Sequence, residues 1–180
     1  MIINDHYLSD AVQISSPNCD ERPDPNDISL LVIHCVSLPP EQFGGDYIDR
    51  LFRNELDAAE DQAFQDIAKL KVSAHLLIRR EGGVTQYVPF HLRAWHAGVS
   101  EYQGRERCND FSLGIELEGS VKQDYTDIQY QRLAEVVRVL LSYYPQLSRH
   151  RIVGHSDIAP GRKTDPGPLF DWERFYGLLG

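Results

Sequence analysis

The sequence has few cysteines and no long apolar run. Cys19, Cys35 and Cys108 are the only three thiols among 180 residues, and an odd number of separated cysteines cannot form a full set of disulfides. Reduced thiols in a cytoplasm are therefore the simplest interpretation. No apolar stretch approaches the ~20 residues that cross a bilayer, and the first residues lack the features of a secretory signal. We expect a cytoplasmic protein with no membrane partner.

Basic residues are also scarce. Lysine and arginine total 18 against 27 aspartate and glutamate residues, which gives a formal net charge of −9. Because nucleic-acid binding depends on Lys and Arg that neutralise phosphates, this balance argues against a nucleic-acid partner. The length fits one domain over residues 1–180. Residues 1–28 are rich in Ser, Pro, Asn and Asp, which predicts an irregular N-terminal lead-in.

The apolar pattern predicts strands and helices that alternate without a strict repeat. Continuous or alternating apolar residues indicate strands, and apolar residues at three- and four-residue steps indicate helices. Thr126 and Gln129 form a capping-box pattern at the start of the clearest helix. The predicted strands are residues 30–36, 72–79, 84–88, 111–118 and 151–154, and the predicted helices are residues 46–54, 126–144 and 172–179. This order favours a single α/β (α+β) domain with a central mixed sheet flanked by helices.

Two histidines occupy positions where strands end. His34 lies near the end of one predicted strand and His155 directly follows another, and ligands of open α/β sheets bind beyond the carboxyl ends of strands. The loop after His155 is rich in proline and glycine, which argues against a regular helix and allows Asp165 to return beside His155. Two neutral imidazoles and a carboxylate are a catalytic zinc set that leaves a fourth position for water. Spacing alone leaves other interpretations open, with His34 as a buried hydrogen-bonding residue and Asp165 as a turn former.

The remaining polar candidates also have simple structural interpretations. Glu116 and Glu118 share the polar face of an alternating strand, which is typical of a face in contact with water. Lys163 fits a solvated loop charge, and His75 and His96 fit structural hydrogen-bonding residues. None of these five residues identifies a reaction by itself.

Five segments of the chain, taken together and in order, resemble a known family. They are residues 31–34, 72–78, 94–100, 108–119 and 154–167. The set resembles the AmpD family of bacterial cytoplasmic N-acetylmuramyl-L-alanine amidases. That family shares its fold with phage lysozyme-type amidases and peptidoglycan recognition proteins. The likeness extends over nearly the whole chain, which makes it far more specific than any single histidine.

The resemblance implies a metal site and a catalytic pair. Carried over by position, it makes His34, His155 and Asp165 the ligands of Zn²⁺, and Glu116 and Lys163 the catalytic residues. The family acts on small soluble 1,6-anhydro-N-acetylmuramyl peptides during peptidoglycan recycling. It hydrolyses the amide between the lactyl group of the sugar and L-alanine, and this removes muropeptides that signal for β-lactamase induction. We expect the protein to be a monomer.

Substrate contacts are less well defined. Because the substrate is anionic, we expect Arg107 and Lys71 to bind its carboxylates. Two positions depart from the family pattern: Cys35 stands where an Asn is expected, and Ala74 stands where the wider superfamily has a Tyr. The first departure predicts a changed substrate contact, and the second places the proton transfer on Glu116.

Two alternatives stay open at this point. The first is a metal-free muropeptide-binding module on the same fold, although such modules typically lose a zinc ligand and this chain keeps all three candidates. The second is a secreted amidase that acts on intact peptidoglycan, against which the missing leader argues.

Overall fold

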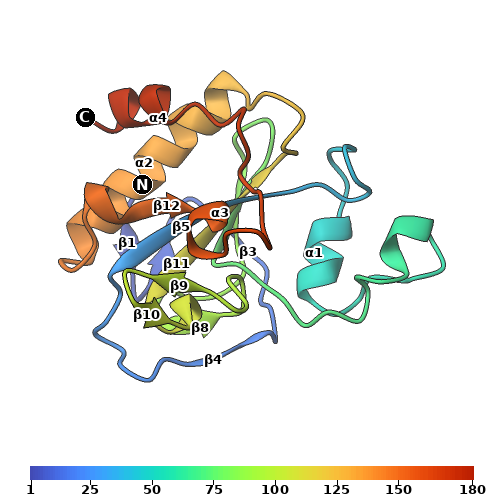
Figure 1. Ribbon diagram of the computed structural model, residues 1–180, viewed down its shortest axis with the longest axis horizontal. Coiled ribbons are helices and arrows are strands. Elements are labelled where there is room, and N and C mark those ends of the chain that lie inside the picture. Colours follow the sequence, from blue (N-terminus) through green and yellow to red (C-terminus); the bar gives the residue numbers. More distant parts are fainter.

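A six-stranded mixed sheet forms the centre of the protein (Figure 1). The computed structural model describes all residues, 1–180. In spatial order the strands are β12 (Ile152–Gly154), β5 (Leu30–Val36), β11 (Ser112–Glu118), β6 (Leu76–Ile78), β7 (Val84–Gln86) and β3 (Val12–Gln13). Every neighbouring pair is parallel except β6 and β7, which are antiparallel. The predicted fold class, a mixed sheet with helices packed on it, is therefore confirmed.

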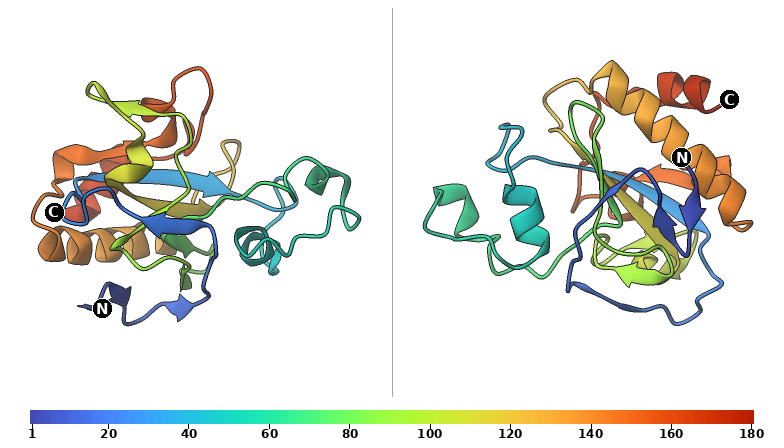
Figure 2. Two further views of the ribbon diagram at one scale, coloured as in Figure 1. Left: turned by 90° about the horizontal axis from the view of Figure 1, so that it is seen from below. Right: turned by 180° about the vertical axis from the view of Figure 1, so that it is seen from behind.

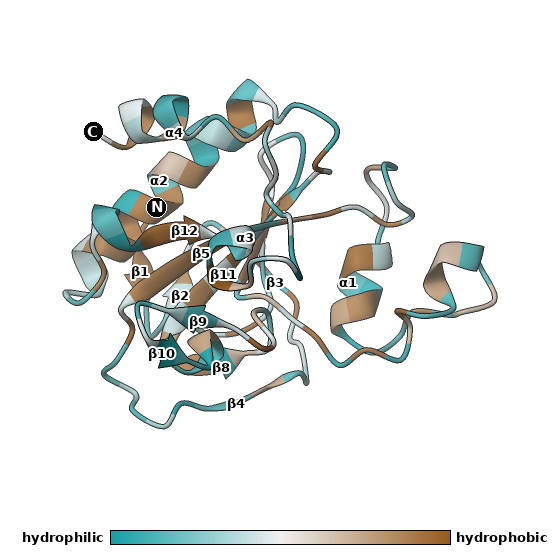
Figure 3. Ribbon diagram, viewed as in Figure 1, coloured by the Kyte–Doolittle hydropathy of each residue, from teal (hydrophilic) through white to brown (hydrophobic).

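Helices α2 (Asp127–Tyr143) and α4 (Trp172–Leu179) cover one face of the sheet (Figure 2). Leu31 and Ile33 of β5 belong to the same buried cluster as Leu133 and Leu140 of α2. Figure 3 shows hydrophobic colouring along the central strands and a mixture of hydrophobic and hydrophilic residues along α2. None of the helices is both long enough and apolar enough to cross a membrane.

The opposite face of the sheet is covered by shorter elements. These are β8 (Leu92–Ala94), β9 (Glu101–Tyr102), β10 (Arg105–Glu106), the 3₁₀ helix η2 (Cys108–Asp110) and the one-turn helix α3 (His155–Ile158). The 3₁₀ helix η3 (Arg149–Arg151) leads into β12. Leu30 and Val32 of β5 pack on this opposite face with Ala97 and Ile158 in a separate apolar cluster. Strand β5 is thus buried on both faces, as its continuous apolar run predicts.

A smaller lobe lies beyond the carboxyl end of β5 (Figures 1 and 2). It contains helix α1 (Tyr47–Phe52) and the 3₁₀ helix η1 (Gln62–Phe64), and it has its own buried cluster. Glu118, at the end of β11, links this lobe to the sheet. Its carboxylate accepts a hydrogen bond from the Gly44 N–H at 2.7 Å and pairs with Arg79 at 3.3 Å.

The N-terminal lead-in is not irregular throughout, so that prediction was wrong. Strands β1 (Ile3–Asn4) and β2 (Tyr7–Leu8) form a hairpin, β3 joins the main sheet beside β7, and β4 (Cys19–Glu21) pairs with β8. These strands are two or three residues long, too short to show a period of two. The partners of β3 and β4 come from residues 84–94, so only the tertiary fold reveals them.

Other predicted elements differ mainly at their ends. Helices α2 and α4 and strand β5 lie where the pattern predicts them, and the capping box of Thr126 and Gln129 is present. The strand predicted over residues 72–79 is a ladder strand only over Leu76–Ile78. Proline and glycine were expected to exclude a helix after His155, yet α3 completes one turn before Pro160.

The polar face of β11 is covered rather than wet. Ser112 and Glu118 are both 1% exposed or less, and Glu116 is only partly accessible. The ring of His96 lies directly over Gly114, where an added Cβ atom would stand 2.5 Å from His96 Cγ. The loop that carries His96 therefore closes over this face, and glycine at position 114 makes that close approach possible.

Candidate metal centre

Three parallel strands bring the candidate residues to one edge of the sheet. In the ladder of β5 and β11, His34 is the direct partner of Glu116. In the ladder of β12 and β5, Gly154 is the partner of Ile33, so that His155 follows beside His34. Because paired residues of parallel strands point to the same face, these side chains emerge together at the carboxyl ends of the strands.

The imidazoles of His34 and His155 and the carboxylate of Asp165 form a nearly equilateral triangle. The two Nδ1 atoms are 3.0 Å apart, and each is 3.1 Å from Asp165 Oδ2. The Ser156 N–H donates to the Asp165 carbonyl at 2.9 Å, which folds the loop back onto α3. His34 and His155 are buried, and the Asp165 side chain is 16% exposed. The structure thus brings together the three residues predicted to bind a metal.

The outer nitrogens of both rings have partners on the protein side. His155 Nε2 lies 3.1 Å from the Ala97 carbonyl, which can only accept, so Nε2 carries the proton and Nδ1 has a free lone pair. His34 Nε2 lies 2.9 Å from His96 Nδ1. When His34 donates through Nε2 to His96, its Nδ1 also presents a lone pair. In that arrangement two nitrogen lone pairs and a carboxylate oxygen face one another with no proton between them. A cation bound there would be coordinated by all three atoms.

The charge states of these groups suit a cation. Burial lowers the pKa of His34 to about 4, although its hydrogen bond with Asp165 acts in the opposite direction. Burial acts to raise the pKa of Asp165, but its close contacts with the imidazoles of His155 and His34 hold that pKa below its usual range. At neutral pH the site therefore offers uncharged imidazole at His34 and an ionised carboxylate, the forms that bind metals.

The geometry of the triangle fits a tetrahedral metal ion. Zinc binds His nitrogen and carboxylate oxygen at ~2.0–2.2 Å, which places two ligand atoms of a tetrahedron ~3.3–3.5 Å apart. The three distances of 3.0–3.1 Å in this site are slightly shorter and need only a small expansion. Two nitrogens and one oxygen also leave a fourth position for water or substrate, as in catalytic zinc sites.

Glu116 faces the same region and lacks a partner. Its Oε2 atom is buried and makes no hydrogen bond. Burial raises the pKa of Glu116 well above its usual value, the nearby charge of Asp165 raises it further, and Lys163 opposes the shift. Lys163 is exposed on the loop after α3, and its backbone N–H donates to the Ala159 carbonyl at 3.0 Å. Glu116 and Lys163 are therefore both within electrostatic range of the triangle.

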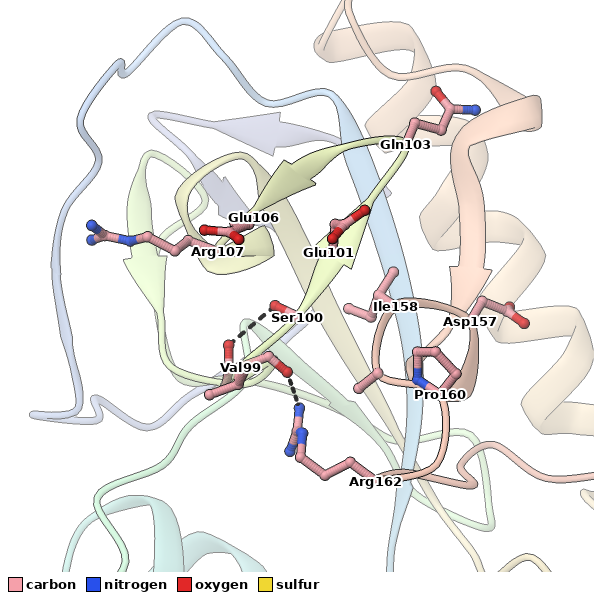
Figure 4. A pocket seen from close by; sticks show the side chains of 12 residues that line it. Val99, Ser100, Glu101, Gln103, Glu106, Arg107, Asp157, Ile158, Pro160 and Arg162 are labelled. Atoms are coloured by element: carbon pink, nitrogen blue, oxygen red, sulfur yellow. Dashed lines mark hydrogen bonds between the residues drawn. The ribbon is translucent and has the colours of Figure 1, made fainter.

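The two residues predicted to bind substrate lie further out. Arg107 lines a groove of about 770 Å³ between the β9–β10 hairpin and α3, drawn in Figure 4. Its side chain is 70% exposed and contacts Asp110 at 3.3 Å. Lys71 is exposed on the segment before β6 and does not line this groove. None of the three triangle residues lines it either. Arg162 lines the groove, and its Nη2 donates to the carbonyls of Ala97 and Val99 at 2.6 Å each.

Cys35 lies on the other face of β5 from His34. Its thiol is half-buried against the main core, and burial raises its pKa to about 12. His96 was expected to be a structural residue, but it contacts His34 directly. His96 lies in one of the five segments that carry the family resemblance, yet its role depends on a contact between residues 62 positions apart.

Comparisons with known proteins agree with this geometry. The family model described as N-acetylmuramoyl-L-alanine amidase matches residues 24–168. The chain is 58% identical over 168 residues to 1,6-anhydro-N-acetylmuramyl-L-alanine amidase AmpD of Haemophilus influenzae, which covers 93% of this chain and 91% of the relative. It is 57% identical over 179 residues to the AmpD of Escherichia coli, which covers 99% of this chain and 97% of the relative.

Solved structures show the same relationship. The crystal structure of a selenomethionine AmpD derivative has a TM-score of 0.97 and 55% identity, and each chain is covered completely. AmpDh3 from Pseudomonas aeruginosa in complex with an anhydromuramic pentapeptide has a TM-score of 0.62 and 29% identity, covering 87% of this chain and 61% of that one. The resemblance seen in the sequence is confirmed, and the chain belongs to the N-acetylmuramoyl-L-alanine amidase family.

Proposed function

We propose that this protein is a zinc-dependent amidase of peptidoglycan recycling. Its substrate is a 1,6-anhydro-N-acetylmuramyl peptide, and the bond hydrolysed is the amide between the lactyl group and L-alanine. The triangle of His34, His155 and Asp165 carries this proposal, because its donor atoms and spacing fit a catalytic zinc ion. The relatives at 55–58% identity carry the name of this activity, which supports the choice of substrate.

The reaction needs a stronger electrophile and a stronger nucleophile than an amide and water provide. Zinc held by His34, His155 and Asp165 would supply both, because this ion polarises a carbonyl oxygen and lowers the pKa of bound water. His34 and His155 contribute neutral nitrogen ligands, and Asp165 contributes the negative charge that offsets part of the charge of the cation. Burial of both imidazoles limits the geometries that they can adopt.

Glu116 is the proposed proton carrier. Its unpartnered Oε2 is available to accept the proton of the attacking water and return it to the departing amine of L-alanine. A carboxyl group with a raised pKa suits this double role, since it must hold the proton between the two transfers. The nearby charge of Lys163 favours the ionised form of Glu116, which is the form that accepts the first proton.

Lys163 is the proposed partner of Glu116. It lies two residues before Asp165 on the same loop, and its charge reaches both Glu116 and His34. As the water adds to the amide carbonyl, negative charge develops on the carbonyl oxygen, and a cation stabilises that charge. Arg107, at the rim of the adjacent groove, and Lys71 are proposed to bind the carboxylates of the stem peptide.

Bound metal and turnover of the Glu116→Gln variant test the proposal directly. The substitution keeps the size of the side chain and all three proposed ligands, so we expect one zinc per chain and a turnover reduced by about 10²–10⁴-fold. Glu135→Gln, an exposed site on α2, is the matched control and should retain full turnover. Unchanged turnover in Glu116→Gln would remove Glu116 from the mechanism.

Two outcomes would replace the proposal with its alternatives. Tight muropeptide binding without release of peptide, in buffer that contains zinc, would indicate a binding module. Faster cleavage of intact sacculi than of soluble anhydro-muropeptides would indicate an amidase of the assembled wall. We expect the opposite preference, with soluble anhydro-muropeptides cleaved faster.

We also propose that the protein acts in the cytoplasm as a monomer. All three cysteines are unpaired thiols in the structure, which suits a reducing compartment. Cell fractionation tests the location, and light scattering of the purified protein tests the oligomeric state.

A further inference from the structure

One dipeptide, His96–Ala97, contacts both imidazoles of the candidate metal centre from behind. His34 Nε2 lies 2.9 Å from His96 Nδ1, and His155 Nε2 lies 3.1 Å from the Ala97 carbonyl. Both contacts use the Nε2 atom, so both Nδ1 atoms are left facing Asp165. The dipeptide comes from the loop that covers the polar face of β11, and neither of its residues belongs to the triangle.

The dipeptide is itself held by one side chain. Asn109 Oδ1 accepts hydrogen bonds from the backbone N–H of His96 at 3.1 Å and of Ala97 at 2.8 Å. A single amide oxygen thus orients two consecutive peptide groups. Asn109 lies on η2, which directly precedes β11, so the position of the dipeptide is set by the same segment that carries Glu116.

The ring of His96 has only one place to lie. Its Nε2 atom is 3.1 Å from Ser112 Oγ, and its face rests on Gly114, where a Cβ atom would be 2.5 Å away. His96 is 9% exposed and Ser112 is fully buried. A ring confined in this way cannot turn away from His34 without displacing β11.

The chemistry of imidazole gives these contacts a consequence. A neutral ring has one N–H and one lone pair, so binding a cation through Nδ1 requires the proton on Nε2. The Ala97 carbonyl accepts a hydrogen bond from the Nε2–H of His155. The Nδ1 atom of His96 accepts a hydrogen bond from the Nε2–H of His34 when the Nε2–H of His96 donates to Ser112 Oγ. Partners of this kind commonly change metal affinity by about 10–100-fold.

We propose that His96 and Asn109 are positioning residues that select the Nδ1-binding form of the two histidine ligands. His96 acts on His34 directly, whereas Asn109 acts on both ligands through the dipeptide. This inference rests on the metal site proposed above and adds two residues to it. It also assigns a role to a buried imidazole and a partly buried amide that lie behind the metal ligands rather than among them.

Zinc affinity tests the proposal without any measurement of turnover. Competition with a chromophoric chelator gives the Kd of the wild type and of four variants. We expect His96→Leu and Asn109→Leu to weaken zinc binding by about 10–100-fold. His96→Asn should restore most of the affinity, because its side-chain oxygen can accept the His34 proton. Asn109→Asp should also restore it, because a carboxylate oxygen still accepts from both backbone N–H groups.

A second measurement needs no substitution in the site. In the zinc-loaded wild type, ¹⁵N NMR shifts of His34, His155 and His96 should show a protonated Nε2 on all three rings. A protonated Nδ1 on His96 in this state would overturn the proposal, because that atom then could not accept from His34.

Val136→Ala is the control for a loss of stability alone. Val136 is fully buried on α2 and packs on the opposite face of the sheet, so its truncation should lower the melting temperature and leave the zinc Kd unchanged. If His96→Leu loses no more affinity than Val136→Ala, the positioning role is refuted while the metal site stands. If the wild type takes up no zinc, the metal site and this inference are both refuted.

Discussion

Glu116 and His34 are direct partners in the parallel ladder between β11 and β5. A proposed proton carrier and a proposed metal ligand are therefore held side by side by backbone hydrogen bonds rather than by a mobile loop. Both strands are buried over most of their length, which resists any change in this pairing. Asp165, by contrast, lies on a loop, and its Oδ2 atom is 3.1 Å from Nδ1 of each imidazole.

Removal of Asp165 should abolish the metal site. We expect Asp165→Ala to lower zinc affinity by at least about 100-fold, because it removes one of three protein ligands and the only negative charge among them. Zinc content after dialysis and turnover should fall together. Asp24→Ala, in an exposed turn, is the control and should keep its zinc. Full zinc content in dialysed Asp165→Ala would contradict the assignment of this ligand.

Glu116 should make the metal-free protein lose stability as the pH rises. Burial raises its folded-state pKa well above the value in the unfolded chain, so the native state holds the proton more tightly. Above the unfolded pKa of about 4.3 the unfolded chain releases that proton first, and the free energy of unfolding falls until the pH passes the folded pKa. In metal-free protein, Glu116→Gln should therefore gain stability relative to wild type as the pH rises from 5 to 8.

Urea unfolding in the presence of a chelator, repeated across that pH range, measures the difference. Contributions of the histidines occur in both proteins and largely cancel. A difference that stays constant with pH would mean that the Glu116 carboxyl is ionised throughout.

We expect substitution of Glu118 to lower the stability of the protein more than substitution of a surface carboxylate. It is 1% exposed, and it accepts hydrogen bonds from the backbone N–H groups of Gly44 and Arg80 as well as pairing with Arg79. Glu118→Ala removes the acceptor of two backbone N–H groups and one of the two carboxylate partners of Arg79, which keeps its ion pair with Asp49. We expect a cost of about 1–3 kcal/mol of unfolding free energy. Denaturant unfolding checks this value.

The contrasting pair is on the surface of α2. Glu135→Ala breaks an ion pair with Arg132 between partly exposed side chains, and we expect a cost of no more than about 0.5 kcal/mol. Similar costs for the two substitutions would refute the linking role assigned to Glu118.

Arg107→Ala and Lys71→Ala should weaken substrate binding. We expect KM to rise by about tenfold or more in each variant with kcat little changed, because a lost carboxylate contact removes binding that ground state and transition state share. Steady-state kinetics with an anhydro-muropeptide gives both constants. Arg53→Ala, on the smaller lobe, is the control. A fall in kcat with unchanged KM would place the residue in the reaction instead.

Much of the fold could be predicted because its main elements carry local signals. The continuous apolar run of β5, the capping box of α2 and the amphipathic pattern of α4 each identify an element without reference to the rest of the chain. The short strands β3 and β4 carry no such signal, because each becomes a strand only by pairing with a distant partner.

Some residues of the candidate site could likewise be predicted from the sequence, and others could not. The strand ends identify His34 and His155, and the proline- and glycine-rich loop after His155 adds Asp165 as a possible third ligand. The likeness of five ordered segments to a known family adds Glu116 and Lys163. His96 and Asn109 were missed as contributors. Their contacts with the site join separate segments of the chain, and no spacing in the sequence predicts such a contact.

The order of residues along the chain was sufficient to identify the longer strands, the long helix, the family and the metal-binding side-chain types, since these depend on local periodicity and on residue identity. The position of the carboxylate between two imidazoles, the burial of Glu116 and the support of both rings by one dipeptide were decided by the tertiary structure alone. The physical reason is that distances between side chains depend on how β5, β11 and β12 pair and on how loops close over them, and these long-range contacts form only when the whole chain is folded.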